Sequence, residues 1–488
     1  RNRYTNYFDK AHNEYFMMKK DSFLSRIHDP VSGLETQSLK LIVLAHGASI
    51  SPPHAHLSRR FYELSRKYFE QAELGKGFLT IAALQSCILL ALFELKQALF
   101  TRAWNSVSRA NWMVQMFVLQ NMDGNLTSPT QKQAQGHLLP PAIDGLEIEE
   151  RRRTFWAAFN LSCFASIGAG WKSYFLVNCA DITTLLPNDD FPDSPSRLTL
   201  YDAFRLSDIE KLTAGQALIS INALCGRCLT HITHAVSKAG PESEDYDFWM
   251  HHCHLIESAT HMASTSLSPS YRSQTEPSTL CCNISLQAIL VCLHNAGAVR
   301  VTRTYASQLP NAYSQTSCQK AALEIARLTR MMMGHIDLTN MSPFIPWSIY
   351  VAAQACIRAL HSNNITKQGL RTSTSPSRGS SSSSSSSMMD FWVMPPNTTD
   401  DITTGSTNGL VKASLFDCNA RAESPASRLA LLDSLKCLMD ALGFFKHFSP
   451  VLGVYEAELR EELNIGKSST DDRLIGFVNF PLDGQHLL

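Results

Sequence analysis

Cysteine and histidine side chains in the middle of the chain come nearest to a spacing that could bind a metal. Cys225 and Cys228 are followed closely by His231 and His234. Five more side chains of these types lie downstream: His251, His252, Cys253, His254 and His261. Zinc needs four such ligands that converge tetrahedrally. On one helix, steps of three residues turn the side chains through about half a turn between Cys225 and His234.

The four closely spaced residues therefore cannot bind one ion from a single helix. A site made of Cys225, Cys228 and two downstream histidines satisfies the geometry, but its spacing matches no zinc-finger pattern. We favour buried helix thiols and assign no metal-binding residue. Whether Cys225 and Cys228 bind metal stays open.

Motifs of enzyme chemistry are scarce in the sequence. Gly466-Lys467-Ser468 resembles the end of a phosphate-binding loop, but Glu461 stands where its first glycine must be. Asp189-Asp190 follows Pro187-Asn188, which is typical of a solvated loop rather than of an acid/base pair. Four N-terminal histidines lie in separate contexts and indicate no catalytic triad: His12, His46, His54 and His56. We therefore predict no catalytic residue and no enzyme activity, and we can name no cofactor-binding residue.

A charged and aromatic stretch from Glu149 to Leu161 is the most informative part of the chain. Its basic triplet, Arg151–Arg153, has the composition of a nuclear-localisation or nucleic-acid patch. However, Glu147 and its neighbouring acids are close enough to pair with the arginines, which point in different directions on a helix. We favour ion pairing inside the protein over nucleic-acid binding.

The order of several motifs resembles a known family. After the triplet come Phe155-Trp156 and then, about twenty residues further on, Asp181-Ile182 and Leu186-Pro187. Together they resemble the central regulatory domain of fungal zinc-cluster transcription factors, the fungal-specific transcription factor domain. Other similar positions run in order through the first 360 residues: Tyr7-Phe8, His12, Ser22–Leu24, Tyr62, Arg66, Leu84-Gln85, Ala103-Trp104, Ala110, Ser342–Phe344, Tyr350 and Ala352-Ala353.

This resemblance implies a helical regulatory domain in a nuclear protein that controls transcription by RNA polymerase II. It also implies DNA binding through an N-terminal zinc cluster, with zinc as its cofactor. The six-cysteine pattern of that cluster is not in this sequence, which begins at Arg1 rather than at Met. We therefore expect the chain to be cut from a longer protein, and we expect no cofactor in the chain itself.

The partners implied by the resemblance are DNA, through the missing module, and the transcription machinery or co-regulators. A small-molecule effector and a homodimer are open alternatives. A second interpretation of the whole chain is an effector-sensing helical domain, or a co-regulator without DNA binding of its own.

The charge balance excludes a general attraction to nucleic acid. The chain has 43 Lys and Arg against 43 Asp and Glu, and neutralisation of phosphates supplies most non-specific DNA affinity. The most apolar stretch, Ile81–Phe93, is shorter than the roughly 20 residues that span a bilayer. We expect no membrane partner. The thirteen cysteines, without a secretory signal, indicate reduced thiols.

Helical periodicity predicts an all-α fold. Apolar residues recur every three to four positions in three stretches: Leu84, Ile88, Ala91, Leu92, Leu95 and Leu99; Trp104, Val107, Ala110, Val114 and Phe117; Phe155, Phe159, Cys163 and Ile167. A further amphipathic helix is indicated at residues 429–442 and another at 454–463.

We divide the chain into a helical domain at 1–361, a disordered Ser/Thr-rich linker at 362–424, and C-terminal helices at 425–488 that pack on the main domain. The linker contains the eight serines Ser380–Ser387, and such a tract buries too little apolar surface to fold. Within it, Met388–Met394 is either an activation segment or a patch that docks on its own domain.

Overall fold

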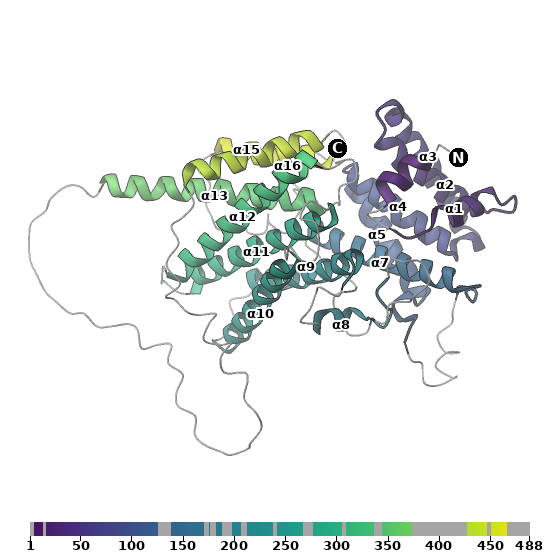
Figure 1. Cartoon of the computed structure of the whole chain (residues 1–488), viewed down its shortest axis with the longest axis horizontal. Coiled ribbons are helices and arrows are strands. Elements are labelled where there is room, and N and C mark those ends of the chain that lie inside the picture. The colour runs from purple at the N-terminus through teal and green to yellow at the C-terminus, as the bar shows by residue number, and fades with distance from the viewer. Residues whose placement is uncertain are drawn as a thin grey trace, which may run out of the picture. The chain divides into compact units, whose positions relative to one another are not determined.

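A computed structural model describes most of the chain (Figure 1). The described residues are 4–12, 16–124, 138–169, 175, 182–187, 198–205, 212–237, 242–266, 277–304, 309–335, 344–372, 427–446 and 450–465. They form helices and connecting segments without a β-strand, so the predicted all-α fold is confirmed. The chain divides into two compact units, residues 1–360 with 426–488 and residues 361–425.

The helices are long, and most belong to the first unit. The N-terminal helices are α1 (Lys20–His28), α2 (Leu34–Ser49), α3 (Ala55–Glu73), α4 (Ile81–Lys96), α5 (Phe100–Met116) and α7 (Gly145–Ala169). The later helices are α8 (Leu200–Arg205), α9 (Ala214–Ser237), α10 (Glu242–Ser266), α11 (Pro277–Thr304), α12 (Leu309–His335), α13 (Phe344–Thr372), α15 (Arg428–Phe445) and α16 (Val451–Ile465). Short helical turns are η2 (Tyr7–Ala11), η4 (Pro52–His54), η5 (Lys76–Phe78) and η6 (Leu119–Asn121).

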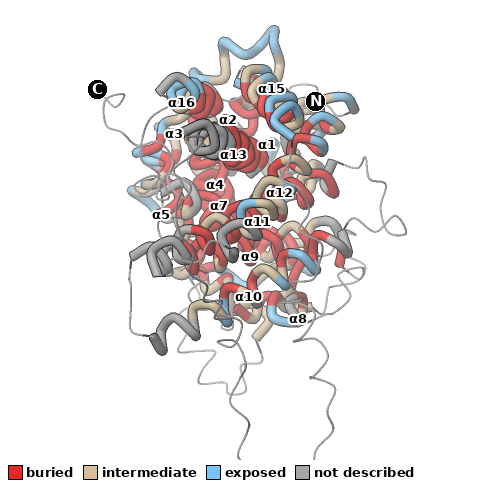
Figure 2. The backbone as a smooth tube through the Cα atoms, turned by 90° about the vertical axis from the view of Figure 1, so that its left-hand side faces the viewer, coloured by how far each residue is buried: buried red, intermediate tan, exposed pale blue. Residues whose placement is uncertain are grey.

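Helix α4 lies at the centre of the N-terminal helices. All its residues from Ala82 to Leu95 are buried, as expected of a helix that is apolar on every side. The side chain of Thr80 accepts a hydrogen bond from the backbone N–H of Ala83 and so caps the helix. Helices α2, α3, α5 and α7 contact α4, and the buried residues in this region are drawn in red in Figure 2.

Helices α2 and α3 pack closely through two small side chains. The Ser38 hydroxyl donates to the Ser65 carbonyl at 3.0 Å, and the Ser65 hydroxyl donates to the Ser38 carbonyl at 2.8 Å. Because both serines are fully buried, each hydroxyl needs a partner inside the protein. The reciprocal bonds supply these partners and hold the two helices side by side.

The C-terminal helices pack around α11. This helix contacts α9, α10 and α12, and α12 in turn contacts α15. Residues Thr279–Ala298 are long and apolar enough to cross a membrane, but 83% of that stretch is buried among the other helices. Helix α13 meets α16 where Tyr350 stacks on Tyr455, with ring centroids 4.7 Å apart. The amide of Gln354 donates to Glu462 at 2.9 Å in the same contact.

Helix α7 joins the two groups of helices. It contacts α4 and α5 among the earlier helices and α9 among the later ones. The predicted stripe on this helix is confirmed for Phe155, Phe159 and Cys163, which are all fully buried. Any side chain that fixes the orientation of α7 therefore affects packing on both sides of it.

The other predicted stripes hold with small corrections. On α4 the stripe ends with Leu95, because the helix ends at Lys96 and Leu99 is 39% exposed. On α15 the buried leucines are Leu431, Leu435, Leu438 and Leu442, whereas Leu429 and Leu432 face solvent. Periodicity finds the helix but does not decide which of two neighbouring apolar faces is covered.

The predicted linker is only partly described. Helix α13 extends to Thr372 and so runs into the segment that was expected to be disordered. The serine tract and Met388–Met394 lie outside the described residues. The division into 1–361, 362–424 and 425–488 stays a prediction. Helix α15 contacts α12, where Arg330 pairs with Asp433 at 2.9 Å.

Two leucines of α15 test whether this helix is an integral part of the core. Leu438 is 0% exposed and Leu432 is 44% exposed. We expect Leu438→Ala to lower the free energy of unfolding by about 2–5 kcal/mol, because it leaves a cavity. Leu432→Ala serves as the control, with an expected change of less than about 0.5 kcal/mol. Urea unfolding followed by circular dichroism measures both, and equal changes would contradict the packing described here.

Candidate functional site

The first turns of α7 carry the charged residues that the sequence singled out. The Asp144 carboxylate accepts a hydrogen bond from the backbone N–H of Glu147 at 2.8 Å, which caps the helix. The Glu147 carboxylate reaches back to the N–H of Ile143 at 2.9 Å. Glu147 lies in the first turn of the helix. Glu149 and Glu150 lie one turn later and take different roles.

Each arginine of the triplet pairs with an acid, and Glu149 pairs with both Arg152 and Arg153. The guanidinium of Arg152 makes two bonds to Asp123, Nε to Oδ2 at 2.8 Å and Nη2 to Oδ1 at 2.5 Å. Arg153 donates to Glu149 at 2.9 Å, and Arg151 donates to Glu147 at 3.2 Å. This confirms that the triplet pairs within the protein.

The arginines are also too buried to form a nucleic-acid patch. The side chains of Arg151, Arg152 and Arg153 are 11%, 12% and 4% exposed. The guanidinium of Arg153 lies 4.3 Å from the centre of the Phe16 ring, a favourable cation–π contact. The triplet thus ties α7 to segments far away in the sequence.

Glu150 connects α7 to helices α1 and α4. Its carboxylate accepts bonds from Arg26 at 2.7 Å and from the Gln85 amide at 2.9 Å. Gln85 also donates to the Thr154 hydroxyl at 3.1 Å and accepts from Arg26 at 3.1 Å. These bonds join α1, α4 and α7 through groups that would otherwise be buried without partners.

The segment 182–187 is fastened to the same frame. Asp123 accepts a bond from the N–H of Leu185 at 3.0 Å, in addition to those from Arg152. The indole of Trp156 donates to the Leu185 carbonyl at 2.8 Å. The structure therefore brings together the triplet, Phe155-Trp156 and Leu186-Pro187, the motifs that carried the resemblance. Asp181 and Asp189-Asp190 lie outside the described residues.

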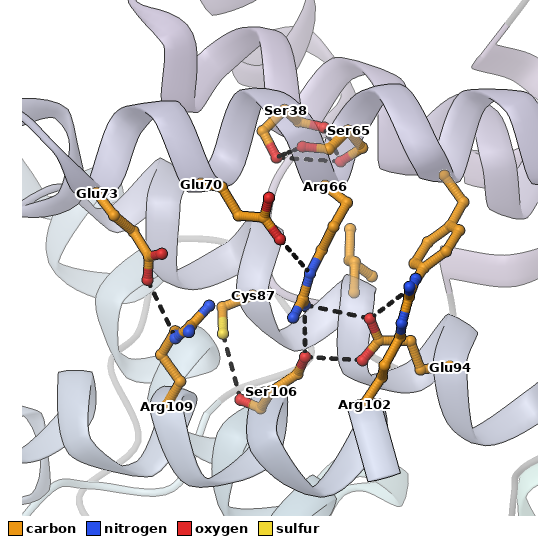
Figure 3. Close-up of polar contacts among 12 residues, drawn as sticks. Ser38, Ser65, Arg66, Glu70, Glu73, Cys87, Glu94, Arg102, Ser106 and Arg109 are labelled. Atoms are coloured by element: carbon orange, nitrogen blue, oxygen red, sulfur yellow. Dashed lines mark hydrogen bonds and ion pairs between the residues drawn. The ribbon is translucent and has the colours of Figure 1, made fainter. Parts of the chain in front are cut away.

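A second buried carboxylate organises α3, α4 and α5 (Figure 3). Glu94 on α4 is 0% exposed. It accepts bonds from the Tyr62 hydroxyl at 2.8 Å, from Ser106 at 2.7 Å and from Arg66 at 3.1 Å. Arg66 also donates to Ser106 at 2.7 Å, and Arg102 donates to the Tyr62 hydroxyl at 3.2 Å.

Burial controls the protonation of this cluster. It raises the pKa of Glu94, and the opposing effects of Arg66, Ser106 and Tyr62 lower it in part. Burial and the nearby Glu94 raise the pKa of Tyr62 to about 12, and burial raises the pKa of the Cys87 thiol to about 12. A neutral tyrosine and a neutral thiol are poor nucleophiles. The cluster is therefore suited to joining helices and not to covalent chemistry.

The candidate metal residues do not converge on one point. Cys225 and Cys228 are both 0% exposed, and burial raises the pKa of Cys228 to about 12. Burial and three neighbouring thiols, those of Cys228, Cys163 and Cys292, raise the pKa of Cys225. Among the residues that the structure describes, no three Cys, His, Asp or Glu side chains are placed to hold a metal ion.

The downstream histidines associate with one another instead. The ring nitrogens His231 Nε2 and His252 Nδ1 are 3.2 Å apart. Two of the N-terminal histidines, His12 and His46, lie near the ring of Tyr7, with ring centroids 5.4 Å and 6.3 Å away. His46 is buried and contacts the Leu89 carbonyl at 2.9 Å, and His12 is buried against Phe8, with ring centroids 4.9 Å apart.

Sequence reasoning missed Asp123 and Glu94, the acids that complete the two buried clusters. Asp123 lies just after a short helical turn, and nothing in its neighbourhood marks it as the partner of Arg152. Glu94 had a usable signal: with Gln85 and Ser86 it interrupts an otherwise apolar helix. A polar residue in such a run needs a buried partner.

Comparisons with known proteins agree with this geometry. Residues 5–232 match the model of the fungal specific transcription factor domain, a range that includes both clusters. That range is slightly less than half of the chain, and it is similar to a family of transcription factors and not of enzymes. No solved structure matches the chain.

Relatives of the chain are fungal transcription activators and transcription factors. The pigment biosynthesis transcriptional activator pigB of Monascus ruber is 27% identical over 71% of this chain and 63% of its own length. The depudecin cluster activator DEP6 of Fusarium langsethiae is 22% identical over 72% of this chain and 58% of its own length. The sorbicillinoid cluster transcription factor 1 of Penicillium rubens is 24% identical, over 71% and 62%. The chain thus spans about three fifths of the length of these relatives.

The Arg152–Asp123 pair tests how far the domain depends on its buried charges. We expect Asp123→Asn to lower the free energy of unfolding by about 2–4 kcal/mol, because the buried guanidinium loses its bidentate countercharge and keeps only the longer contact to Glu149 at 3.3 Å. Asp433→Asn is the matched control, since it removes an acid from an arginine pair whose side chains are 54% and 68% exposed. Its expected effect is below about 1 kcal/mol. Urea unfolding at fixed pH compares them, and similar losses would contradict a special role for Asp123.

The Tyr62 hydroxyl tests the second cluster. Tyr62→Phe removes one donor from the buried Glu94 carboxylate, and we expect a loss of about 1–3 kcal/mol in the free energy of unfolding. Tyr68→Phe on the same helix is the control, because Tyr68 is only partly buried. Thermal unfolding at pH 7 measures both variants. A Tyr62→Phe protein as stable as the parent would show that Glu94 does not need this bond.

Proposed function

We propose that this chain is the regulatory part of a nuclear zinc-cluster transcription factor that controls transcription by RNA polymerase II. The observation that carries the proposal is the match of residues 5–232 to the fungal specific transcription factor domain. The buried contacts around α7 also support the proposal. They connect the arginine triplet and Trp156 to the segment 182–187, and these are the motifs that resemble the family.

DNA binding would belong to a separate module that holds zinc. Two observations support this division. The chain has equal numbers of acidic and basic residues, and the three arginines of the triplet form ion pairs inside the protein. Specific DNA binding needs a basic surface with side chains that reach base edges. The described residues of this chain offer no six-cysteine cluster for such a module.

The target would be a set of genes for a secondary product. The relatives named above are activators of pigment and depudecin biosynthesis and a transcription factor of a sorbicillinoid biosynthetic cluster. We propose the same class of target for this chain, with the transcription machinery or co-regulators as protein partners. A small-molecule effector and a homodimer stay predictions.

Reporter transcription tests the regulatory role. The 488-residue chain, fused to an unrelated DNA-binding module, should change the transcription of a reporter with that module's site. We expect Asp123→Asn to weaken the effect, because it loosens α7, and Asp433→Asn to keep it. The unrelated module alone sets the baseline. A fusion that leaves the reporter at baseline would contradict the proposal.

Gel-shift measurements test whether DNA binding belongs to a separate module and not to this chain. The chain alone, without the fused module, should not retain any duplex from a randomised pool at 150 mM salt. Sequence-specific and salt-resistant retention would show that DNA recognition lies within these residues.

A further inference from the structure

A cluster of histidines joins α10 to its two neighbours, α9 and α11. His231 comes from α9, His251 and His252 come from α10, and His294 comes from α11. His231, His252 and His294 are buried, with exposed fractions of 8%, 3% and 8%. The proposed regulatory role uses none of these residues.

Aromatic rings enclose the two central imidazoles. Phe248 stacks on His231 with ring centroids 4.5 Å apart and planes inclined by 14°. The same ring lies 5.4 Å from His252 at 22°, and Trp249 meets His252 edge-on at 5.4 Å. Such flat apolar contacts exclude water from the imidazoles, which disfavours their charged form.

The backbone of α11 also closes on the cluster. A Cβ atom added to Gly297 would lie 3.0 Å from the Nε2 atom of His252. This close approach leaves no room for a water molecule between that ring nitrogen and the helix backbone. The His252 side chain is therefore held between α9, on which it meets His231, and α11.

The hydrogen bond between His231 and His252 requires a neutral ring nitrogen. One nitrogen donates its proton and the other accepts it across the 3.2 Å separation. When both imidazoles are fully protonated, neither ring nitrogen can accept, so the bond is lost and two positive charges face each other. The pair is thus compatible with neutral imidazoles and incompatible with full protonation.

The surrounding ionisable groups add to the repulsion. The groups that act on the charge of His252 are His231 from α9, His294 from α11 and His251 from its own helix. His251 is in turn affected by Arg227 from α9 and by His254 from α10. Every one of these groups is positive or becomes positive in acid, so protons added to the cluster repel one another.

We propose that this cluster is a proton-sensitive latch, which holds α10 against α9 and α11 while the imidazoles are neutral and releases α10 when they are protonated. The released helix would uncover apolar surface on α9 and α11. Release is a local opening, because the ion pairs around α7 contain no histidine.

The direction of the pH dependence follows from the burial of the rings. Burial lowers the pKa of His252 to about 3 and that of His294 to about 4, from an ordinary value of 6.5. In the released state both rings meet water and regain their ordinary pKa. The latch therefore has its full stability above about pH 6.5 and loses it as the pH falls toward 4. Each proton taken up multiplies the opening constant by about ten per pH unit.

Hydrogen–deuterium exchange on the 488-residue protein tests the latch. Amides of α10 are compared at pH 7.5 and pH 5.5, after correction for the intrinsic pH dependence of exchange, with amides of α5 as the internal reference. With two histidines involved, we expect the opening constant of α10 to rise about 100-fold between these pH values, while that of α5 stays nearly constant.

Neutral substitutions separate the latch from a general acid effect. His252→Gln and His294→Gln should each reduce the rise for α10 to about tenfold, because each removes one titrating group. His56→Gln, which changes an exposed histidine on α3, should keep the full rise. If His252→Gln does not fold, the single change at His294 still decides. An α10 opening constant that is independent of pH, or a full rise in both variants, would overturn the proposal.

Discussion

The ion pair between Arg152 and Asp123 is the contact that joins α7 to the segment 182–187. A guanidinium buried to this degree is stable only if a countercharge and fixed acceptors replace its water. Asp123 supplies two oxygens in a bidentate bond and also accepts from the N–H of Leu185. The same residue therefore fixes the orientation of α7 and the course of the segment that follows it.

Other side chains of α7 also restrain its position against the neighbouring helices. Glu150 connects the helix to Arg26 and Gln85. Further along the same helix, Phe155 and Phe159 are fully buried. Because α7 contacts α4, α5 and α9, a rotation of α7 would leave buried charges on one side and cavities on the other. Unpaired buried charges and cavities both lower the stability of a protein. The orientation of α7 must therefore satisfy its ion pairs and its apolar contacts at the same time.

The sequence was sufficient for the features that depend on local spacing. The central apolar helix, the stripe through Phe155 and Phe159, and the internal pairing of the arginine triplet follow from periodicity and from neighbouring acids. It was not sufficient for partners brought together by folding. Asp123 is 29 residues from Arg152, and the choice among distant acids depends on how the helices pack. The exposure of Leu429 and Leu432 on α15 could not be predicted for the same reason, since the neighbouring helix decides which residues are buried.

The contacts of the histidines also could not be predicted from spacing in the sequence. The sequence groups them by spacing with Cys225 and Cys228, which suggested metal chemistry, but the fold places the thiols beside other thiols and the imidazoles beside other imidazoles. The consequence is a difference in how two helices are held. Helix α7 is fastened by ion pairs of arginine, which stays charged at any physiological pH, whereas α10 is fastened by rings that must stay neutral. The ion pairs around α7 keep their charge while the contacts of α10 respond to protons, because the two kinds of contact involve different helices and different residue types.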